Sequence, residues 1–174
     1  MAPKEFRIRK VLVIPLLLCA LLASALLGIS WCQGEPPARL VLPVSFTLLF
    51  TFLAVNILVR RLRIDEKSVS QRRLWGVKTI PFDDIHRFDA TQVRNRVFFA
   101  LSTSDRYLIF TNAYADLGDI LKTLLERIPP HNVGAEIPPL ADLPPLRQAN
   151  VIPLWLMVAI LGAAIGLQLH PLLP

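Results

Sequence analysis

Histidines and closely spaced carboxylates are the side chains from which metal sites and acid–base pairs are most often built. The three histidines of the chain are His86, His131 and His170. They lie far apart in the sequence, and no two of them share a metal-binding spacing. Asp83 and Asp84 are adjacent, but neighbouring strand residues point to opposite faces, and their position just after Pro81 is typical of a turn. We therefore predict no metal site and no catalytic residue.

Other catalytic motifs are missing from the sequence as well. It contains no Gly-rich phosphate loop, no nucleophile elbow and no helix-borne His-Glu zinc motif, and it has only seven glycines. Cys19 and Cys32 fall in one apolar block, where helical geometry separates them by about 19 Å, far beyond the ~7 Å limit on Cα separation in a disulfide. The sequence therefore predicts a protein that is not an enzyme, with no cofactor and no disulfide.

Three long apolar blocks account for the hydrophobic share of 53% and the mean hydropathy of +0.50. About twenty helical residues cross the ~30 Å hydrocarbon layer of a bilayer, and a charge at its centre opposes insertion by about 2.5–3.5 kcal/mol. The blocks contain no Lys, Arg, Asp or Glu. We expect transmembrane helices at about 11–32, 40–59 and 151–169.

The first block also has features of a cleaved signal peptide. Basic residues precede it, and Ala23-Ser24-Ala25 has the small-x-small form of a cleavage site. The apolar run continues past this point through Leu26 and Ile29, where a mature protein would begin with a polar segment. We favour an uncleaved span, and the signal peptide is the alternative.

Basic residues next to the spans set the expected orientation. Four of the first ten residues are Lys or Arg, and Arg60, Arg61 and Arg63 follow the second block. The loop between the first two blocks carries one arginine and one glutamate. The amino terminus and the central domain are therefore expected on the cytoplasmic face, and the third span leads outward to a short tail.

Between the second and third spans, the sequence changes to the alternation of apolar and polar residues that is typical of half-buried strands. The alternation begins at Leu62 and Ile64, and turn residues follow at 65–67, at Gly76 and at 103–105. The further expected strands are 68–75, 77–81, 85–90, 96–102 and 106–111. Short strands at this spacing predict an antiparallel meander.

One amphipathic helix is expected after the strands. Apolar residues recur at helical spacing from Leu117 to Ile128, Asn112 is the expected N-cap, and Pro129-Pro130 ends the helix. The segment that follows has two further Pro-Pro pairs and reads as an extended linker. The expected parts are an N-terminal basic segment with a helical hairpin at 1–59, a domain at 60–128, a linker at 129–150, and a third span with its tail at 151–174.

A hairpin followed by a strand that leaves through an Ile-Pro turn is encoded by Ile64-Asp65-Glu66-Lys67-Ser68-Val69 and Thr79-Ile80-Pro81-Phe82-Asp83-Asp84-Ile85. With its short strands and single C-terminal helix, the segment 60–128 resembles the bacterial pleckstrin-homology-like (PH-like) domains attached to transmembrane helices. The resemblance implies an α+β membrane protein, in which three transmembrane helices accompany a PH-like antiparallel β-barrel or sandwich capped by one amphipathic helix. A PH-like barrel has seven strands. Six are expected here, and a further short strand fits near residues 91–94.

Five arginines are candidate contacts with an anionic membrane surface. They are Arg60, Arg61, Arg63, Arg72 and Arg73. The positive-inside bias alone also explains the first three, so that topology and lipid recognition are alternatives. Phosphoinositide-binding PH domains carry basic residues around the first hairpin loop, where this chain has Asp65 and Glu66. Nucleic-acid binding is not expected, because the segment 60–150 has fourteen Lys or Arg against eleven Asp or Glu and no aromatic-rich basic face.

Small residues recur at helical spacing within two of the spans. They are Ala20, Ser24 and Gly28 in the first span, and Gly162 and Gly166 in the third. Small residues let helices approach closely in a membrane. Packing within a three-helix bundle and homo-oligomerisation are both consistent with this pattern.

The resemblance implies docking or scaffolding rather than chemistry. The first hypothesis is a membrane-tethered module that docks a protein partner at the inner face of the bacterial cytoplasmic membrane, with membrane lipid as its other contact. The alternative is a small accessory subunit of a transport or enzyme complex, in which Asn56 and Gln168 supply polar contacts within the membrane. A membrane enzyme comes third.

Overall fold

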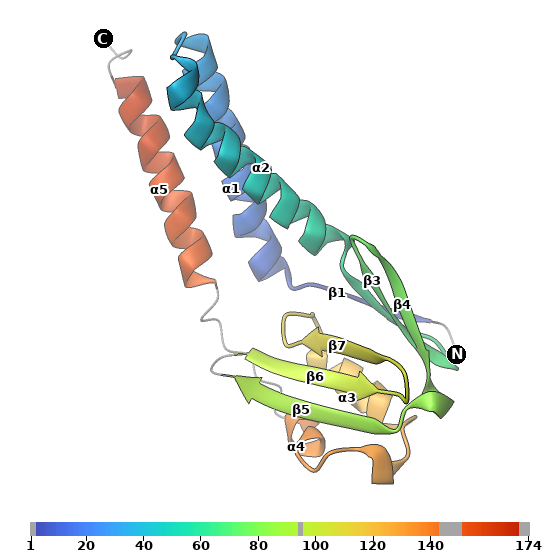
Figure 1. Cartoon of the computed structure of the whole chain (residues 1–174). Coiled ribbons are helices and arrows are strands. Elements are labelled where there is room, and N and C mark those ends of the chain that lie inside the picture. Colours follow the sequence, from blue (N-terminus) through green and yellow to red (C-terminus); the bar gives the residue numbers. More distant parts are fainter. Residues whose placement is uncertain (1–2, 94–95, 143–150, 171–174) are drawn as a thin grey trace. The chain divides into compact units, whose positions relative to one another are not determined.

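The computed structural model describes residues 3–93, 96–142 and 151–170. The chain divides into two compact units, each with its own internal contacts. The first, which we call the sheet unit, comprises Met1–Arg9 and Leu58–Arg147, and the second, the helical unit, comprises Lys10–Ile57 and Gln148–Pro174. The N-terminal residues therefore belong to the same unit as the central domain, although two long helices lie between them in the chain (Figure 1).

A four-stranded antiparallel sheet forms one half of the sheet unit, in the order β1-β2-β3-β4. Its strands are β1 (Lys4–Arg7), β2 (Arg61–Ile64), β3 (Ser68–Arg73) and β4 (Gly76–Pro81). Ile64, Val69 and Ile80 are in register on β2, β3 and β4, and alternation turns all three toward the core. The turn between β3 and β4 ends at Gly76, whose φ of 133° is a conformation that other residues rarely adopt.

The second sheet is three-stranded and antiparallel, in the order β5-β6-β7. Its strands are β5 (Arg87–Val93), β6 (Arg96–Ser102) and β7 (Tyr107–Thr111), and η1 (Phe82–Asp84) leads into it from β4. Every second residue of β6 is buried, namely Val97, Phe99 and Leu101. Phe99 stacks on Phe110 of β7 with 5.1 Å between the ring centroids. The α+β class and the antiparallel strands expected from the sequence are confirmed.

The strand that the sequence analysis missed is β1, which lies before the first span. It pairs along its whole length with β2, and buried Phe6 stands opposite Leu62. On its other side the chain meets the segment after β7, where Ala115 N donates to Arg7 O at 2.8 Å and Arg9 N donates to Ala113 O at 3.0 Å. The N-terminal residues therefore join the two sheets. Residues 91–93, where a further strand was expected, extend β5 instead.

Helix α3 (Leu117–Leu125) follows β7 and is shorter than expected. Asn112 is not its N-cap, because its N–H still donates to Val97 O of β6 at 3.2 Å and so prolongs the sheet. The N-cap position is occupied by Asp116, in the left-handed conformation with φ 52°. The buried face of α3 covers the core with Leu117, Ile120, Leu121 and Leu124.

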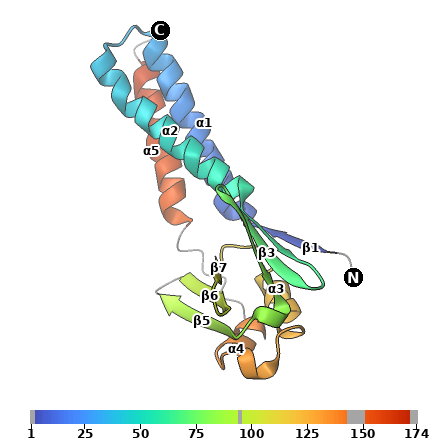
Figure 2. The same ribbon diagram turned by 45° about the vertical axis from the view of Figure 1, so that its right-hand side comes forward.

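Part of the segment that was expected to be an extended linker is folded. It forms η2 (Pro130–Asn132) and the short helix α4 (Ile137–Asp142), which packs against α3 (Figure 2). Between them, Val133 makes a parallel bridge to Phe88 of β5, and Gly134 N donates to Phe88 O at 2.7 Å. The side chain of Ile137 is fully buried. The remainder of that linker, 143–150, lies outside the described residues.

The helical unit contains α1 (Lys10–Cys32), α2 (Pro37–Val59) and α5 (Ile152–Leu169). Their most apolar windows have mean hydropathies of 2.7, 2.2 and 2.1, so that all three are long and apolar enough to cross a membrane. The three expected spans are therefore confirmed as helices. Pro15, Pro43 and Pro153 lie in the first two turns of these helices, where few main-chain hydrogen bonds are lost.

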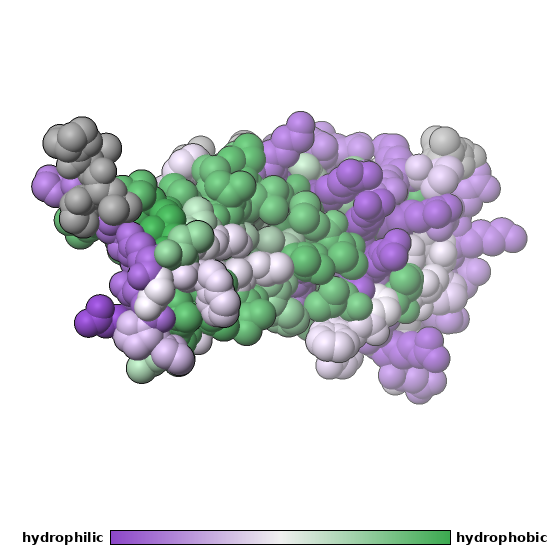
Figure 3. Space-filling view, turned by 90° about the horizontal axis from the view of Figure 1, so that it is seen from above, coloured by the Kyte–Doolittle hydropathy of each residue, from purple (hydrophilic) through white to green (hydrophobic). Residues whose placement is uncertain are grey.

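A small apolar cluster packs the three helices of this unit together. Its buried members are Leu16, Cys19, Ala23, Leu26, Phe50, Ala54 and Leu161. Most other apolar side chains of the helices face outward, and they form the broad hydrophobic surface in the space-filling view (Figure 3). Such a surface suits lipid rather than water, which supports a membrane protein.

Candidate functional site

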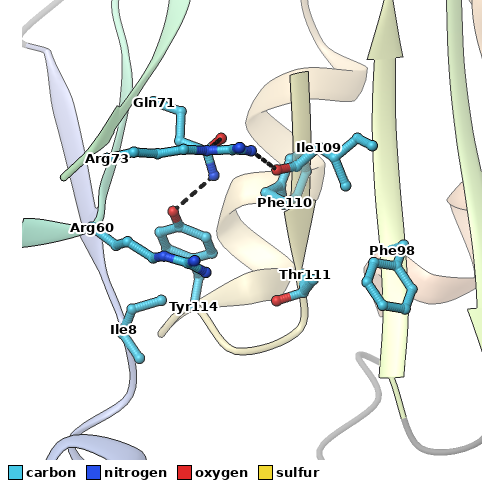
Figure 4. A pocket seen from close by; sticks show the side chains of 9 residues that line it. All are labelled: Ile8, Arg60, Gln71, Arg73, Phe98, Ile109, Phe110, Thr111 and Tyr114. Carbon is cyan, nitrogen blue, oxygen red and sulfur yellow. Dashed lines mark hydrogen bonds between the residues drawn. The ribbon is translucent and has the colours of Figure 1, made fainter. Parts of the chain in front are cut away.

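The sheet unit contains a pocket of about 190 Å³ with a polar and an apolar wall (Figure 4). The polar wall is formed by Arg60, Gln71, Arg73, Thr111 and Tyr114. The apolar wall is formed by Ile8, Phe98, Ile109 and Phe110. All nine residues come from the two sheets and from the short segments that adjoin β1, β2 and β7.

Strand register explains why these side chains converge. Gln71 stands opposite Leu62 on the inner face of the four-stranded sheet. Arg60 precedes Leu62 by two residues, and Arg73 follows Gln71 by two. Because side chains alternate along a strand with a period of two, both arginines return to that inner face. Continuing the register from the pair Arg61 and Arg72 brings Arg60 and Arg73 opposite each other. The two arginines therefore stand at the open end of the core.

A chain of hydrogen bonds fixes the polar wall. Arg73 Nε donates to Gln71 Oε1 at 2.9 Å, and Gln71 Nε2 donates to the Tyr114 hydroxyl oxygen at 3.1 Å. Arg73 Nη2 also donates to the main-chain oxygen of Ile109 on β7 at 3.0 Å. Gln71 and Tyr114 are 3% and 2% exposed, so the bond between their side chains is shielded from water. Arg73 thus ties the four-stranded sheet to the three-stranded one.

Tyr114 keeps its proton at neutral pH. Burial raises the pKa of its hydroxyl, and the hydrogen bond from Gln71 and the charges of Arg60 and Arg73 offset part of that rise. The nine lining residues include no carboxylate. The lining therefore contains two positively charged side chains and a neutral hydroxyl.

The five arginines singled out in the sequence fall into different environments. Arg61 forms an ion pair with Glu5 at 3.0 Å, and Arg63 forms one with Asp65 at 2.9 Å. Arg72 is exposed and stands beside Arg61 in the sheet, while Arg60 and Arg73 line the pocket. The structure therefore brings only two of the five together in one concave site. Their contact with a membrane surface stays a prediction.

Two residues of the site were missed by sequence reasoning. Gln71 is a polar residue at a buried strand position, and nothing in the alternation of β3 distinguishes it from an exposed one. Tyr114 follows the last strand and belongs to no periodic element, so it gave no signal. Its isolated bridge to Ile8 depends on the N-terminal segment, which the sequence analysis had not placed in the domain.

Residues that were weighed for chemistry lie apart from this pocket. Asp83 and Asp84 sit in η1, the turn expected after Pro81. His86 enters the sheet through a main-chain bond from its N to Ser102 O at 2.9 Å. Within residues 3–93, 96–142 and 151–170, no group of three or more His, Cys, Asp or Glu is placed to hold a metal ion.

A second feature of the sheet unit is a group of three residues on β4 and β7, each of which is the last strand of its sheet. Val77 and Lys78 are neighbours on β4 and therefore point to opposite faces of that sheet. Val77 is 63% exposed and Tyr107 is 62% exposed, and Lys78 Nζ lies 4.4 Å from the centroid of the Tyr107 ring. We call these three residues the β4–β7 strip. β4 is the last strand of its sheet, so its far edge has no strand neighbour in the part of the chain that the structure describes.

The small residues of the spans do not all pack within the helical unit. Ala20 packs against the apolar cluster, and Ser24 Oγ donates to Ala20 O at 2.8 Å. A side chain built at Gly28, Gly162 or Gly166 would meet nothing within 4 Å. The three glycines therefore face open space in the single chain, and whether a second copy covers them stays a prediction.

Comparisons of the chain with protein-family models, with curated proteins and with solved structures found no match.

Proposed function

We propose that the chain is a membrane-anchored PH-like module that docks a protein partner at the inner face of the bacterial cytoplasmic membrane. The observation that carries this proposal is β1. With it, the sheet unit has a four-stranded and a three-stranded antiparallel sheet followed by a helix that covers the core. That strand number is the one that the PH-like resemblance implies.

The topology of the proposal rests on strand pairing and charge. β1 precedes α1 and β2 follows α2, yet the two strands are hydrogen-bonded neighbours. Two spans in succession return the chain to its starting side, which agrees with this pairing. The basic residues on both flanks of the pair, Arg7 and Arg9 on one and Arg60 and Arg61 on the other, favour the cytoplasmic side.

The proposed docking surface for the protein partner is the β4–β7 strip. The outer edge of β4 has no strand neighbour among the described residues, and it suits an extended segment of another protein, whose main-chain hydrogen bonds would join those of the sheet. Such a segment could contact Val77 on one face of β4 and Lys78 on the other. Lys78 beside Tyr107 gives the strip a positive charge. We therefore propose that the partner segment is extended and carries an acidic residue.

The alternative, an accessory subunit held by polar contacts within the membrane, has less support. Gln168 Nε2 donates to Ser30 Oγ at 3.0 Å, and Gln33 Nε2 donates to Gln168 O at 3.5 Å. The side-chain nitrogen and the main-chain oxygen of Gln168 are thus engaged inside the helical unit, whereas its Oε1 is buried without a donor among the described residues. Asn56 also has a partner of its own. The accessory-subunit hypothesis stays a prediction, and it predicts that the chain is purified in mild detergent as part of a stable complex.

Site-specific photo-crosslinking in intact cells tests the proposed function. A crosslinking amino acid is placed at position 77, at position 107, or at position 93 as a control, where Val93 is 53% exposed on β5. We expect the same adduct from the first two positions, none from the third, and loss of the adduct when Lys78→Glu is added. Crosslinks of equal yield from position 93, or none from 77 and 107, would rule out the strip as the docking surface.

The orientation is tested separately with a reporter that is active only outside the cytoplasm. Fused after Arg63, within β2, it is expected to be inactive, and fused to the C-terminal tail it is expected to be active. The reverse pattern would contradict the cytoplasmic placement of the sheet unit.

A further inference from the structure

We propose that the pocket between Arg60 and Arg73 binds the phosphate group of an anionic phospholipid, drawn from the membrane that α1 and α2 enter. The proposal requires that these helices span a membrane. It does not require the protein partner or the β4–β7 strip. It also separates the five candidate arginines, because it assigns headgroup binding to the pocket pair and not to Arg61 or Arg63.

The position of the pocket in the chain makes lipid the natural source of the phosphate. Arg60 is the single residue between the end of α2 at Val59 and the start of β2 at Arg61. Consecutive Cα atoms are about 3.8 Å apart, so Arg60 begins within one residue of the last helical residue of a span. Ile8, on the apolar wall, lies two residues before α1 begins at Lys10. Both connections to the spans thus begin within two residues of a residue that lines the pocket.

The polar wall has the donors that a phosphate needs. A guanidinium is planar and presents several N–H groups, and it matches two phosphate oxygens at once. Two such groups stand opposite each other in adjacent strand positions. The Tyr114 hydroxyl accepts from Gln71 and, because burial keeps it protonated, can donate its own hydrogen.

The charge of the pocket is the strongest indication of an anion. The hydrogen bonds of Arg73 go to neutral oxygens, those of the Gln71 side chain and the Ile109 main chain. Arg61 and Arg63, by contrast, each have a carboxylate at 3.0 Å or less. The outer face of the four-stranded sheet carries a row of three arginines, Arg7, Arg61 and Arg72. Glu5 forms ion pairs with the first two. The surrounding field therefore attracts an anion to the mouth.

Size and surroundings agree with a lipid headgroup. A water molecule takes about 30 Å³ of the liquid, so a pocket of about 190 Å³ has room for a phosphate with several waters. Trp75 is 86% exposed in the β3–β4 turn, three residues beyond Arg72 toward the same end of the sheet. Tryptophan prefers the headgroup region of membranes, which suits an exposed ring at that place.

Lipid binding to the purified full chain in a neutral detergent tests the proposal. The midpoint of thermal unfolding is titrated with phosphatidylglycerol, with phosphatidylcholine, and with sn-glycerol 3-phosphate or inorganic phosphate at matched ionic strength. We expect only phosphatidylglycerol to raise the midpoint at low concentration. Arg60→Gln and Arg73→Gln are each expected to weaken the apparent affinity about fivefold, and the matched controls Arg63→Gln and Arg87→Gln to leave it unchanged.

Each other outcome overturns the proposal. Equal weakening by the control variants would mean a diffuse attraction of the surface for anionic lipid. An equal effect of the soluble phosphates would assign the pocket to a small anion. If Arg73→Gln fails to fold because its bonds to Gln71 and Ile109 are lost, Arg60→Gln alone tests the proposal. An unchanged affinity of Arg60→Gln for phosphatidylglycerol would then contradict the proposal. Crosslinking from position 77 in Arg60→Gln reports separately on the protein partner.

Discussion

The two units of the chain use the same apolar residue types in opposite ways. In the sheet unit, Phe88, Phe99 and Leu108 are completely buried, and polar side chains face outward. In the helical unit, Leu21 is 64% exposed and Leu48 is 67% exposed, although both are as apolar as any core residue. The sheet unit therefore gains stability by enclosing its own core, whereas the helical unit needs hydrocarbon around it.

Buried polar groups show the same contrast. In the sheet unit, the buried side chain of Gln71 both accepts and donates a hydrogen bond. In the helical unit, Gln168 Nε2 is bonded to Ser30, but Gln168 Oε1 is buried without a donor in the described part of the chain. A polar network that is complete fixes one arrangement of its surroundings, and an incomplete one does so less well. We expect the sheet unit to have the more sharply defined packing.

The largest expected effect is the difference in stability loss between removing a buried phenylalanine ring and removing an exposed one. Phe6→Ala removes a ring that is 6% exposed between two sheets, and we expect it to lower the free energy of unfolding of the sheet unit by about 3–5 kcal/mol. Phe52→Ala removes the same ring from α2, where it is 47% exposed, and is expected to cost less than about 1 kcal/mol. Urea titration in mild detergent, read by proteolysis within the sheet unit for Phe6→Ala and within the helical unit for Phe52→Ala, measures both. Equal costs would erase the contrast between the units.

A smaller effect is expected from one added methyl group. A Cβ at Gly134 would lie 3.1 Å from Asp89 Oδ1 and 3.2 Å from the main-chain oxygen of Phe88, so Gly134→Ala should cost about 1–3 kcal/mol. The matched control is Gly162→Ala in α5, where the same group meets nothing within 4 Å and no cost is expected. Thermal unfolding compares the two. If Gly134→Ala left the stability unchanged, the close contact between Gly134 and Phe88 of β5 would not constrain the folded part of the linker.

The smallest effect is a pH dependence confined to the sheet unit. Burial raises the pKa of Tyr114 above its ordinary value of about 10, so the unfolded chain releases this proton at a lower pH than the folded chain does. The free energy of unfolding should then fall as pH rises through about 10, by at most about 1.4 kcal/mol per pH unit. Unfolding measured between pH 8 and about 11 should show this fall in the wild type and in Tyr107→Phe. Tyr114→Phe should lack it, and an unchanged slope there would assign the fall to another group.

Local pattern was enough to predict most elements of the fold. The three spans follow from uninterrupted apolar runs, and β6 was predicted with its observed bounds because Val97, Phe99 and Leu101 alternate strictly. β1 was missed because Lys4 and Arg7 match the basic flank of a span, and its partner β2 begins only after two complete helices. Pairing over such a distance leaves no signal in a short sequence window. α4 was missed because its six residues include two prolines.

The candidate site was predictable only in part, and for a related reason. Arg60 and Arg73 were singled out by charge, but their convergence depends on strand register, which the sequence alone does not give. Gln71 and Tyr114 lie at positions whose burial is set by contacts between distant segments. Residues whose own charge marks them as candidates were thus predicted from the sequence. Residues whose role depends on burial by distant segments were not.

The place of β1 ahead of both long helices has a consequence for biosynthesis. The ribosome makes this strand before the two helices, and its partner emerges only after the whole helical hairpin has been synthesised. Until then, Phe6 and Ile8 have no β2 to pack with. Closure of the domain therefore depends on the synthesis of both helices of the hairpin.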